Sequence, residues 1–75
     1  MKNISGRRIK GRRQELGLGQ VDLAAALTVD FEIILDQSDV SEMERGIRGI
    51  KDIELDAISR ILDVSPLWLM RGDEV

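Results

Sequence analysis

The sequence predicts an all-α fold, a compact bundle of five short helices in a single domain that spans residues 1–75. Apolar residues recur at the three- and four-residue spacing of helices along most of the chain. Residues that favour helix starts and ends divide the chain at short intervals. A chain of 75 residues is also the size of one small domain. Such a domain buries only about 60% of the surface of its unfolded chain, which leaves no room for a large active-site cleft.

The first helix is expected over residues 4–16. Three apolar residues fall on one side of it, Ile4, Ile9 and Leu16, among basic and polar neighbours. Gly17 follows, and glycine commonly ends a helix because it adopts the left-handed conformation without strain. This helix therefore has a thin apolar stripe and a broad basic face.

The second helix is expected over residues 20–31, beginning at Gln20. Its apolar face is formed by Leu23, Ala24 and Leu27. In residues 28–36, apolar and polar residues alternate as they do in a strand. A lone strand would have no partner in this chain, so the helix is expected to continue to Phe31 and residues 33–35 to form the turn.

The remaining helices are expected over residues 37–45, 52–62 and 66–71. Asp36 and Ser65 are good N-caps for two of them, because their side chains can accept from unpaired N–H groups. Proline fits the first turn of the last helix, and Gly46 marks the end of the third. The fourth helix has a predicted buried stripe of Leu55, Ile58 and Leu62.

The composition argues against an enzyme, a metal site and a bound cofactor. The chain has neither cysteine nor histidine, so a thiolate metal site and the commonest general base are both missing. The Gly-Leu-Gly sequence at 17–19 is only a fragment of a phosphate-binding motif and follows no predicted strand. No apolar run reaches membrane-spanning length. We expect a cytoplasmic protein without a membrane partner.

The charge is distributed unevenly. The net charge is −3, yet six of the eleven basic residues lie within residues 1–13, and all fourteen acidic residues follow them. The two parts of the chain would therefore interact very differently with a polyanion. Taken alone, a basic run is usually a solvated helix face, so it needs support from a recognition motif.

Three segments supply that support. LGLGQVDLA at 16–24, DQSDVSEMERG at 36–46 and DIELDAISRILDVSPLWLMRG at 52–72 occur in this order. Together they resemble the helix-turn-helix domain of the lambdoid phage repressor and Cro family, over residues 5–72. The resemblance implies a lambda-repressor-like domain that binds double-stranded DNA in a sequence-specific manner and regulates transcription. The connection before the third helix resembles that of family members with an extended turn.

The resemblance places the start of the third helix in the major groove. Gln37 and Ser38 would reach base edges, and a glutamine amide can bind adenine through two hydrogen bonds. Asp39, Ser41 and Glu42 line the same face. Taken alone, a Gln-Ser pair would be the ordinary polar start of a helix. The three segments that occur here in the order of the family favour contacts with bases instead.

The acids of this segment divide by role. In the family the glutamate of the Glu-x-Gly ending pairs with an arginine of the first helix, which implies a structural ion pair between Glu44 and Arg13. Glu42 and Asp39 could accept from cytosine N4, and Asp39 could instead stabilise its own helix. Whether these two acids face DNA or a protein partner stays open.

Contacts to the DNA backbone are expected from the second helix, the loop after the third helix and the first helix. Gln20 would lie against a phosphate in the family, and helix N-termini bind anions. The expected basic contacts are Arg45, Arg48 and Lys51 of the loop and Arg8 of the first helix. Exposed basic residues often serve solubility only, so the loop is the safer assignment.

The last helix is too apolar to be wholly internal. We expect Trp68 and Leu69 in the core and Leu67 and Met70 at the two-fold surface of a homodimer. No ligand-sensing domain is expected after Val75.

A protein-interaction module of the same fold is the alternative function. It would act as an anti-repressor, an antitoxin-like partner or a modulator of another regulator, and the acidic balance after residue 13 keeps it open.

Overall fold

Residues 1–72 of the computed structural model form five helices joined by short connections. These are α1 (Gly6–Glu15), α2 (Gln20–Phe31), α3 (Gln37–Glu44), α4 (Asp52–Leu62) and α5 (Pro66–Arg71). No strand occurs within this described part of the chain, and the predicted all-α, five-helix fold is confirmed. The final three residues of the predicted domain, 73–75, lie outside the described residues.

The first helix begins two residues later than predicted, at Gly6. The side-chain oxygen of Asn3 accepts from the N–H groups of Ser5 and Gly6, at 3.0 and 2.8 Å, and this local turn precedes the helix. The predicted apolar stripe is therefore wrong at both ends: Ile4 is 65% exposed and Leu16 is 41% exposed. Both lie outside the helix, and only Ile9 of the three enters the core.

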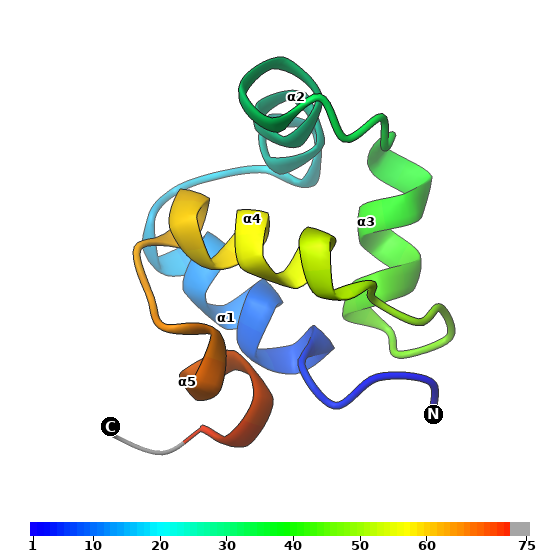
Figure 1. The fold of residues 1–75 in the computed structure, drawn as a ribbon, viewed down its shortest axis with the longest axis vertical. Helices are drawn as coiled ribbons and strands as arrows, with labels where there is room; N and C mark the ends of the chain where they lie inside the picture. Colours follow the sequence, from blue (N-terminus) through cyan, green and yellow to red (C-terminus); the bar gives the residue numbers. More distant parts are fainter. Residues whose placement is uncertain (73–75) are drawn as a thin grey trace.

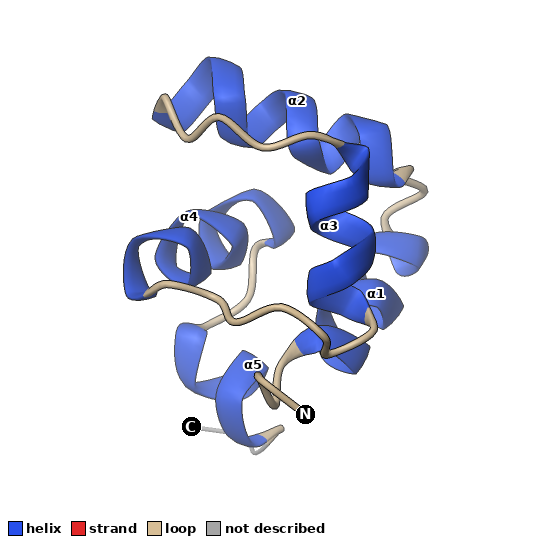
Figure 2. Cartoon of the chain, turned by 90° about the vertical axis from the view of Figure 1, so that its right-hand side faces the viewer, coloured by secondary structure: helices blue, strands red, loops and turns tan. Residues whose placement is uncertain are grey.

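The strand-like segment is not a strand. As predicted, α2 ends at Phe31 and residues 32–36 connect it to α3. Glu32 adopts a left-handed conformation (φ 57°) at the end of α2, and the next N–H, of Ile33, returns to the carbonyl of Leu27 at 3.0 Å. Figure 2 shows the connection running back along α2 to the start of α3. The alternation of apolar and polar residues therefore reflects an irregular connection whose side chains are alternately half-buried and exposed.

The core lies where α2, α3 and α4 meet, with α1 behind them and α5 below α4 (Figure 1). The fully buried apolar side chains come from all five helices: Ile9, Leu23, Ala24, Leu27, Val40, Met43, Ala57, Ile58, Leu62 and Leu69. Trp68 and Leu55 are only partly buried and pack against this cluster. None of the helices in residues 1–72 is long and apolar enough to cross a membrane.

Three acids stabilise the starts of helices. In α2, α3 and α4 the carboxylate at the third helical position accepts from the N–H of the residue that precedes the helix. The pairs are Gly19 with Asp22 (2.7 Å), Asp36 with Asp39 (3.0 Å) and Lys51 with Glu54 (2.9 Å). This arrangement pairs an otherwise free donor and places negative charge at the positive end of the helix dipole.

Candidate nucleic-acid interface

The N-terminal end of α3 is held at the surface by a reciprocal cap. The Asp39 N–H donates to the Asp36 carboxylate at 2.9 Å, and the Asp36 N–H donates to the Asp39 carboxylate at 3.0 Å. Val40 on the inner side of the helix is fully buried. Gln37 and Ser38 in the first turn are therefore exposed, while Ser41 and Glu42 are half-buried one turn further along. Figure 2 shows α3 standing at the face of the molecule.

Two glutamines meet at the N-termini of α2 and α3. The Gln37 amide donates to the Gln20 side-chain oxygen at 3.4 Å, and the Gln20 amide donates to Glu44 at 3.0 Å. The structure thus brings together the first residue of each helix, and Gln20 is oriented by a buried carboxylate behind it. The exposed Gln37 amide is held in place by this contact without being covered.

Glu44 points into the protein. Arg13 donates to it twice, from Nε at 2.7 Å and from Nη2 at 3.0 Å, and Nη1 of the same arginine donates to the Leu18 carbonyl at 2.8 Å. Both residues are almost completely buried, at 7% and 6% exposure. The hydrogen bond to Glu44 raises the pKa of Arg13 despite the opposing effect of burial. Glu44 therefore joins α3 to α1 and α2, and its charge does not face outward.

Arg48 is half-buried and bound to acids of the protein. Its Nη1 and Nη2 donate to the two carboxylate oxygens of Glu54 at 3.2 and 3.3 Å, and its Nε lies 3.9 Å from Asp39. The hydrogen bonds to Glu54 raise the pKa of Arg48. The pKa of Asp39 is lowered, first by the backbone hydrogen bond from Asp36, with a smaller contribution from the charge of Arg48. The side chain of Arg48 is thus held by two acids of the protein, and its predicted contact with the DNA backbone stays a prediction.

The basic residues of α1 are largely used inside the fold. Arg8 donates to the carbonyls of Leu69 (3.1 Å) and Met70 (3.3 Å) near the end of α5, and α5 lies away from α3 in Figure 1. Arg12 donates to the Leu62 carbonyl at the end of α4, at 2.9 Å. The guanidinium of Arg8 thus binds carbonyls at a helix end, and its contact with the DNA backbone stays a prediction.

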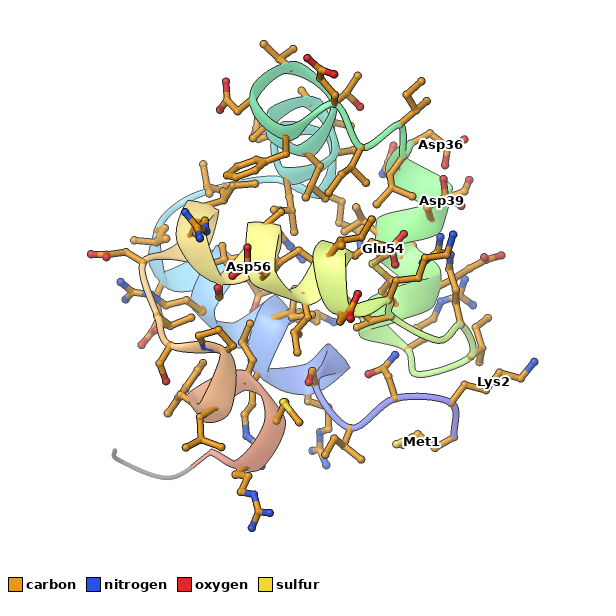
Figure 3. The ribbon with its side chains drawn as sticks, viewed as in Figure 1. Met1, Lys2, Asp36, Asp39, Glu54 and Asp56 are labelled. Atoms are coloured by element: carbon orange, nitrogen blue, oxygen red, sulfur yellow. The ribbon has the colours of Figure 1, made fainter. Side chains whose placement is uncertain are left out.

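The segment before α1 lies against the loop that follows α3. The Lys2 N–H donates to the Gly46 carbonyl at 2.8 Å, and the Asn3 amide donates to the carbonyls of Met43 and Arg48 at 2.9 and 2.8 Å. Figure 3 shows the Lys2 side chain projecting away from the body of the molecule. The sequence-based prediction did not include Asn3, although an asparagine within three residues of a helix start often binds the free N–H groups there.

Residues 45–51 form that loop, and two of its basic residues are open to solvent. Arg45 is exposed directly after α3, and Lys51 is exposed directly before α4. The Arg45 guanidinium contacts the Ser41 carbonyl at 3.4 Å, and Met1 lies over Gly46, whose φ is 74°. A cationic edge therefore borders the outer face of α3 on the side of this loop.

A shallow apolar groove lies elsewhere on the molecule. It has a volume of about 590 Å³ and lies between the end of α2 and the first half of α4. Its lining residues are Phe31, Ile33, Asp52, Ile53, Asp56 and Ala57. Figure 3 places Asp56 on α4 at a distance from α3. Within residues 1–72, no group of three or more acids is placed to hold a metal ion.

Comparisons with known proteins agree with this geometry. A family model described as helix-turn-helix matches residues 9–69. The chain is 38% identical over 74 residues to the HTH-type transcriptional regulator DicA of Escherichia coli (strain K12). The matched region covers 97% of this chain and 50% of that relative. The chain thus spans about half the length of the curated relative it matches.

One solved structure resembles the whole described fold. It is a crystal structure of the P22 c2 repressor protein in complex with a synthetic operator, 9T. The match has a TM-score of 0.80 and a sequence identity of 28%, and it covers 95% of this chain and 98% of the other. The arrangement of the five helices is therefore that of a repressor solved on its operator.

Proposed function

Because this chain belongs to the helix-turn-helix family, we propose that it is a sequence-specific regulator of transcription that binds double-stranded DNA with α3 in the major groove. The observation that carries the proposal is the pair of glutamines at the starts of α2 and α3. It holds an exposed amide at the helix end that enters the groove in this class of domain. The proposed activity is binding, without catalysis, and it takes place in the cytoplasm where the DNA lies.

Base reading is assigned to the outer side of α3. Gln37 and Ser38 are the first candidates for base contacts, because both are exposed in the first turn. A glutamine amide also matches the donor and acceptor of adenine. Ser41 and Glu42 follow one turn later, and the carboxylate of Glu42 can accept from cytosine N4. Asp39 is engaged by its cap and by Arg48, so it contributes to the shape of this surface and not to base contacts.

Affinity is assigned to groups around α3. Gln20 and the free N–H groups at the start of α2 face a phosphate, because helix N-termini attract anions. Arg45 and Lys51 add charge from the loop, and the exposed Lys2 lies on the segment packed against that loop. Such contacts set the register of the protein on DNA and carry no base information.

A homodimer is proposed through α5. Leu67 and Met70 are 37% and 43% exposed, next to the fully buried Leu69. Apolar side chains grouped on a surface helix favour contact with another protein surface. A two-fold pair would place two copies of α3 in half-sites about one DNA turn apart, which requires a palindromic site.

Selection from random duplex DNA tests the proposal. The chain, purified at a salt concentration near 0.15 M, is taken through repeated rounds of binding, and the enriched duplexes are sequenced. We expect an enriched palindrome or half-palindrome whose measured affinity falls steeply with salt, with a log–log slope of about 0.9 for each phosphate contact. Failure to enrich any sequence, with weak binding that does not depend on sequence, would contradict the proposed function.

Binding of a protein partner is the second candidate, favoured by the groove between α2 and α4. Its floor is apolar, and Asp52 and Asp56 lie at its edge, so it suits a basic segment with apolar side chains. The same selection distinguishes the two candidates, because a protein that acts only through this groove should enrich no DNA sequence. Loss of partner binding in Ile53→Asp, with unchanged folding, would then support the second candidate.

A further inference from the structure

Arg48 lies near three acids that belong to two helices, α3 and α4. Its guanidinium binds Glu54 of α4 through two hydrogen bonds and lies 3.9 Å from the Asp39 carboxylate of α3. Glu42, one turn further along α3, is also near enough to favour the charged form of Arg48. In Figure 3 the Asp39 and Glu54 side chains come from α3 and α4 on the same side of the molecule. One loop cation therefore lies against Asp39 of the surface that would enter a DNA groove, and the charge of Glu42 also acts on it.

Glu54 fixes the side chain of Arg48. Glu54 is only 3% exposed, and its carboxylate also accepts from the Lys51 N–H at 2.9 Å. A buried carboxylate needs its partners, because an unpaired charge in the protein interior is strongly unfavourable. The bidentate geometry sets the plane of the guanidinium as well as its position.

Asn3 fixes the main chain at the same residue. Its amide donates to the Arg48 carbonyl at 2.8 Å and to the Met43 carbonyl at 2.9 Å. The arginine is therefore held at both ends, by the segment before α1 and by α4. A side chain restrained in this way is poorly suited to turn outward and wrap a phosphate.

We propose that Arg48 is a positioning residue that acts as an internal counter-ion, neutralising the acids of α3 while the helix lies against DNA. The proposal rests on the proposed DNA-binding function. Without this charge, the carboxylates of Asp39 and Glu42 would stand unneutralised close to phosphates of the same sign, and repulsion between like charges opposes binding. In this role Arg48 increases affinity without contacting DNA.

A double-mutant cycle on the selected duplex separates the two roles of Arg48. Dissociation constants are measured by fluorescence anisotropy for the native chain, Arg48→Gln, Asp39→Asn and the combination. Asparagine keeps an oxygen that can accept from the Asp36 N–H, so the helix cap survives. If Arg48 acts through Asp39, we expect Arg48→Gln to weaken binding about tenfold in the native chain and no more than about threefold in the Asp39→Asn background.

An equal loss in both backgrounds would overturn the inference, since a direct phosphate contact does not depend on Asp39. Arg45→Gln is the matched control, because Arg45 is an exposed arginine of the same loop whose guanidinium contacts a carbonyl, not an acid. Its loss should be the same in both backgrounds. If the native chain binds the duplex and the cycle shows no coupling, only this inference fails; if the native chain binds no selected duplex, the proposed function fails as well.

Folding is controlled with Glu54→Gln. Removing Arg48 leaves the buried carboxylate of Glu54 with fewer partners, so an effect on folding has to be separated from the loss of the positive charge. The cycle is therefore repeated in the Glu54→Gln background, where the amide oxygen can still accept from the Lys51 N–H. Far-ultraviolet circular dichroism at the assay temperature verifies that every variant is folded. The coupling between Arg48 and Asp39 should keep its sign there at a smaller magnitude, because glutamine holds the guanidinium less firmly than the Glu54 carboxylate does; a coupling of the opposite sign would contradict the inference.

Discussion

Glu44 is the residue through which α1, α2 and α3 are joined. Its carboxylate accepts two hydrogen bonds from Arg13 and one from Gln20. A charged pair buried to this extent contributes little net stability compared with an apolar pair, but removing one member alone leaves the other unpaired. The ion pair therefore fixes the position of α3 more than it adds to stability.

The Glu44→Ala variant should lose about 3 kcal/mol of unfolding free energy, because it leaves the guanidinium of Arg13 buried without its partner. Urea denaturation followed by circular dichroism measures this loss. Glu42→Ala is the matched control on the same helix, since Glu42 is only half-buried; its effect should be within about 0.5 kcal/mol. Similar losses in the two variants would show that the pair with Arg13 has no special role.

Residue roles could be predicted from the sequence only where the family resemblance named a partner. Glu44 and Arg13, and Gln20 and Gln37, were paired in this way and lie in contact. The sequence did not indicate the role of Asn3 or the intramolecular partners of Arg8 and Arg48. The sequence shows the same arginine whether its side chain binds a phosphate or caps a helix. Because the partners within the protein are distant in sequence, only the folded structure shows which groups the arginine contacts.

At the scale of elements, helix bounds follow closely from caps and spacing. All five helices begin and end within two residues of the predicted positions. The largest difference, at the start of α1, arises from the side chain of Asn3, which replaces the first helical turn with a local turn. Taken alone, the alternation of apolar and polar residues before α3 would wrongly predict a strand, because an irregular connection with one half-buried side has the same two-residue period.

The short helix α5 carries the proposed contact between the two copies of the homodimer. Changing Leu67 and Met70 together to Glu should abolish the two-fold contact, because two pairs of like charges would face each other there. We expect the variant to bind a single half-site as the native chain does and to lose cooperative binding to the palindrome. Gel-shift titrations of both duplexes measure this difference.

Val29→Glu provides the control for that prediction. Val29 is also an exposed apolar residue, but it lies near the end of α2 and not on α5. The control variant should retain cooperative binding to the palindrome. Unchanged cooperativity in the Leu67 and Met70 variant would exclude α5 as the dimer surface.

At the scale of the whole molecule, charge alone is a poor guide to function. The basic residues of the N-terminal segment suggested a broad cationic face, yet Arg8, Arg12 and Arg13 are engaged with carbonyls and a carboxylate of the fold. Lys2, Arg7 and Lys10 remain exposed, and the net charge of the protein is −3. We therefore expect weak binding to arbitrary DNA and a strong dependence on the correct sequence.

The exposed start of α3 is expected to read bases, and the Gln37→Ala variant measures the contribution of its first residue. Dissociation constants are measured for the native chain and the variant on the selected duplex and on a shuffled duplex of the same composition. We predict a loss of about 1–3 kcal/mol on the selected duplex and almost none on the shuffled one, because only a base contact depends on sequence. An equal loss on both duplexes would show that Gln37 does not read a base.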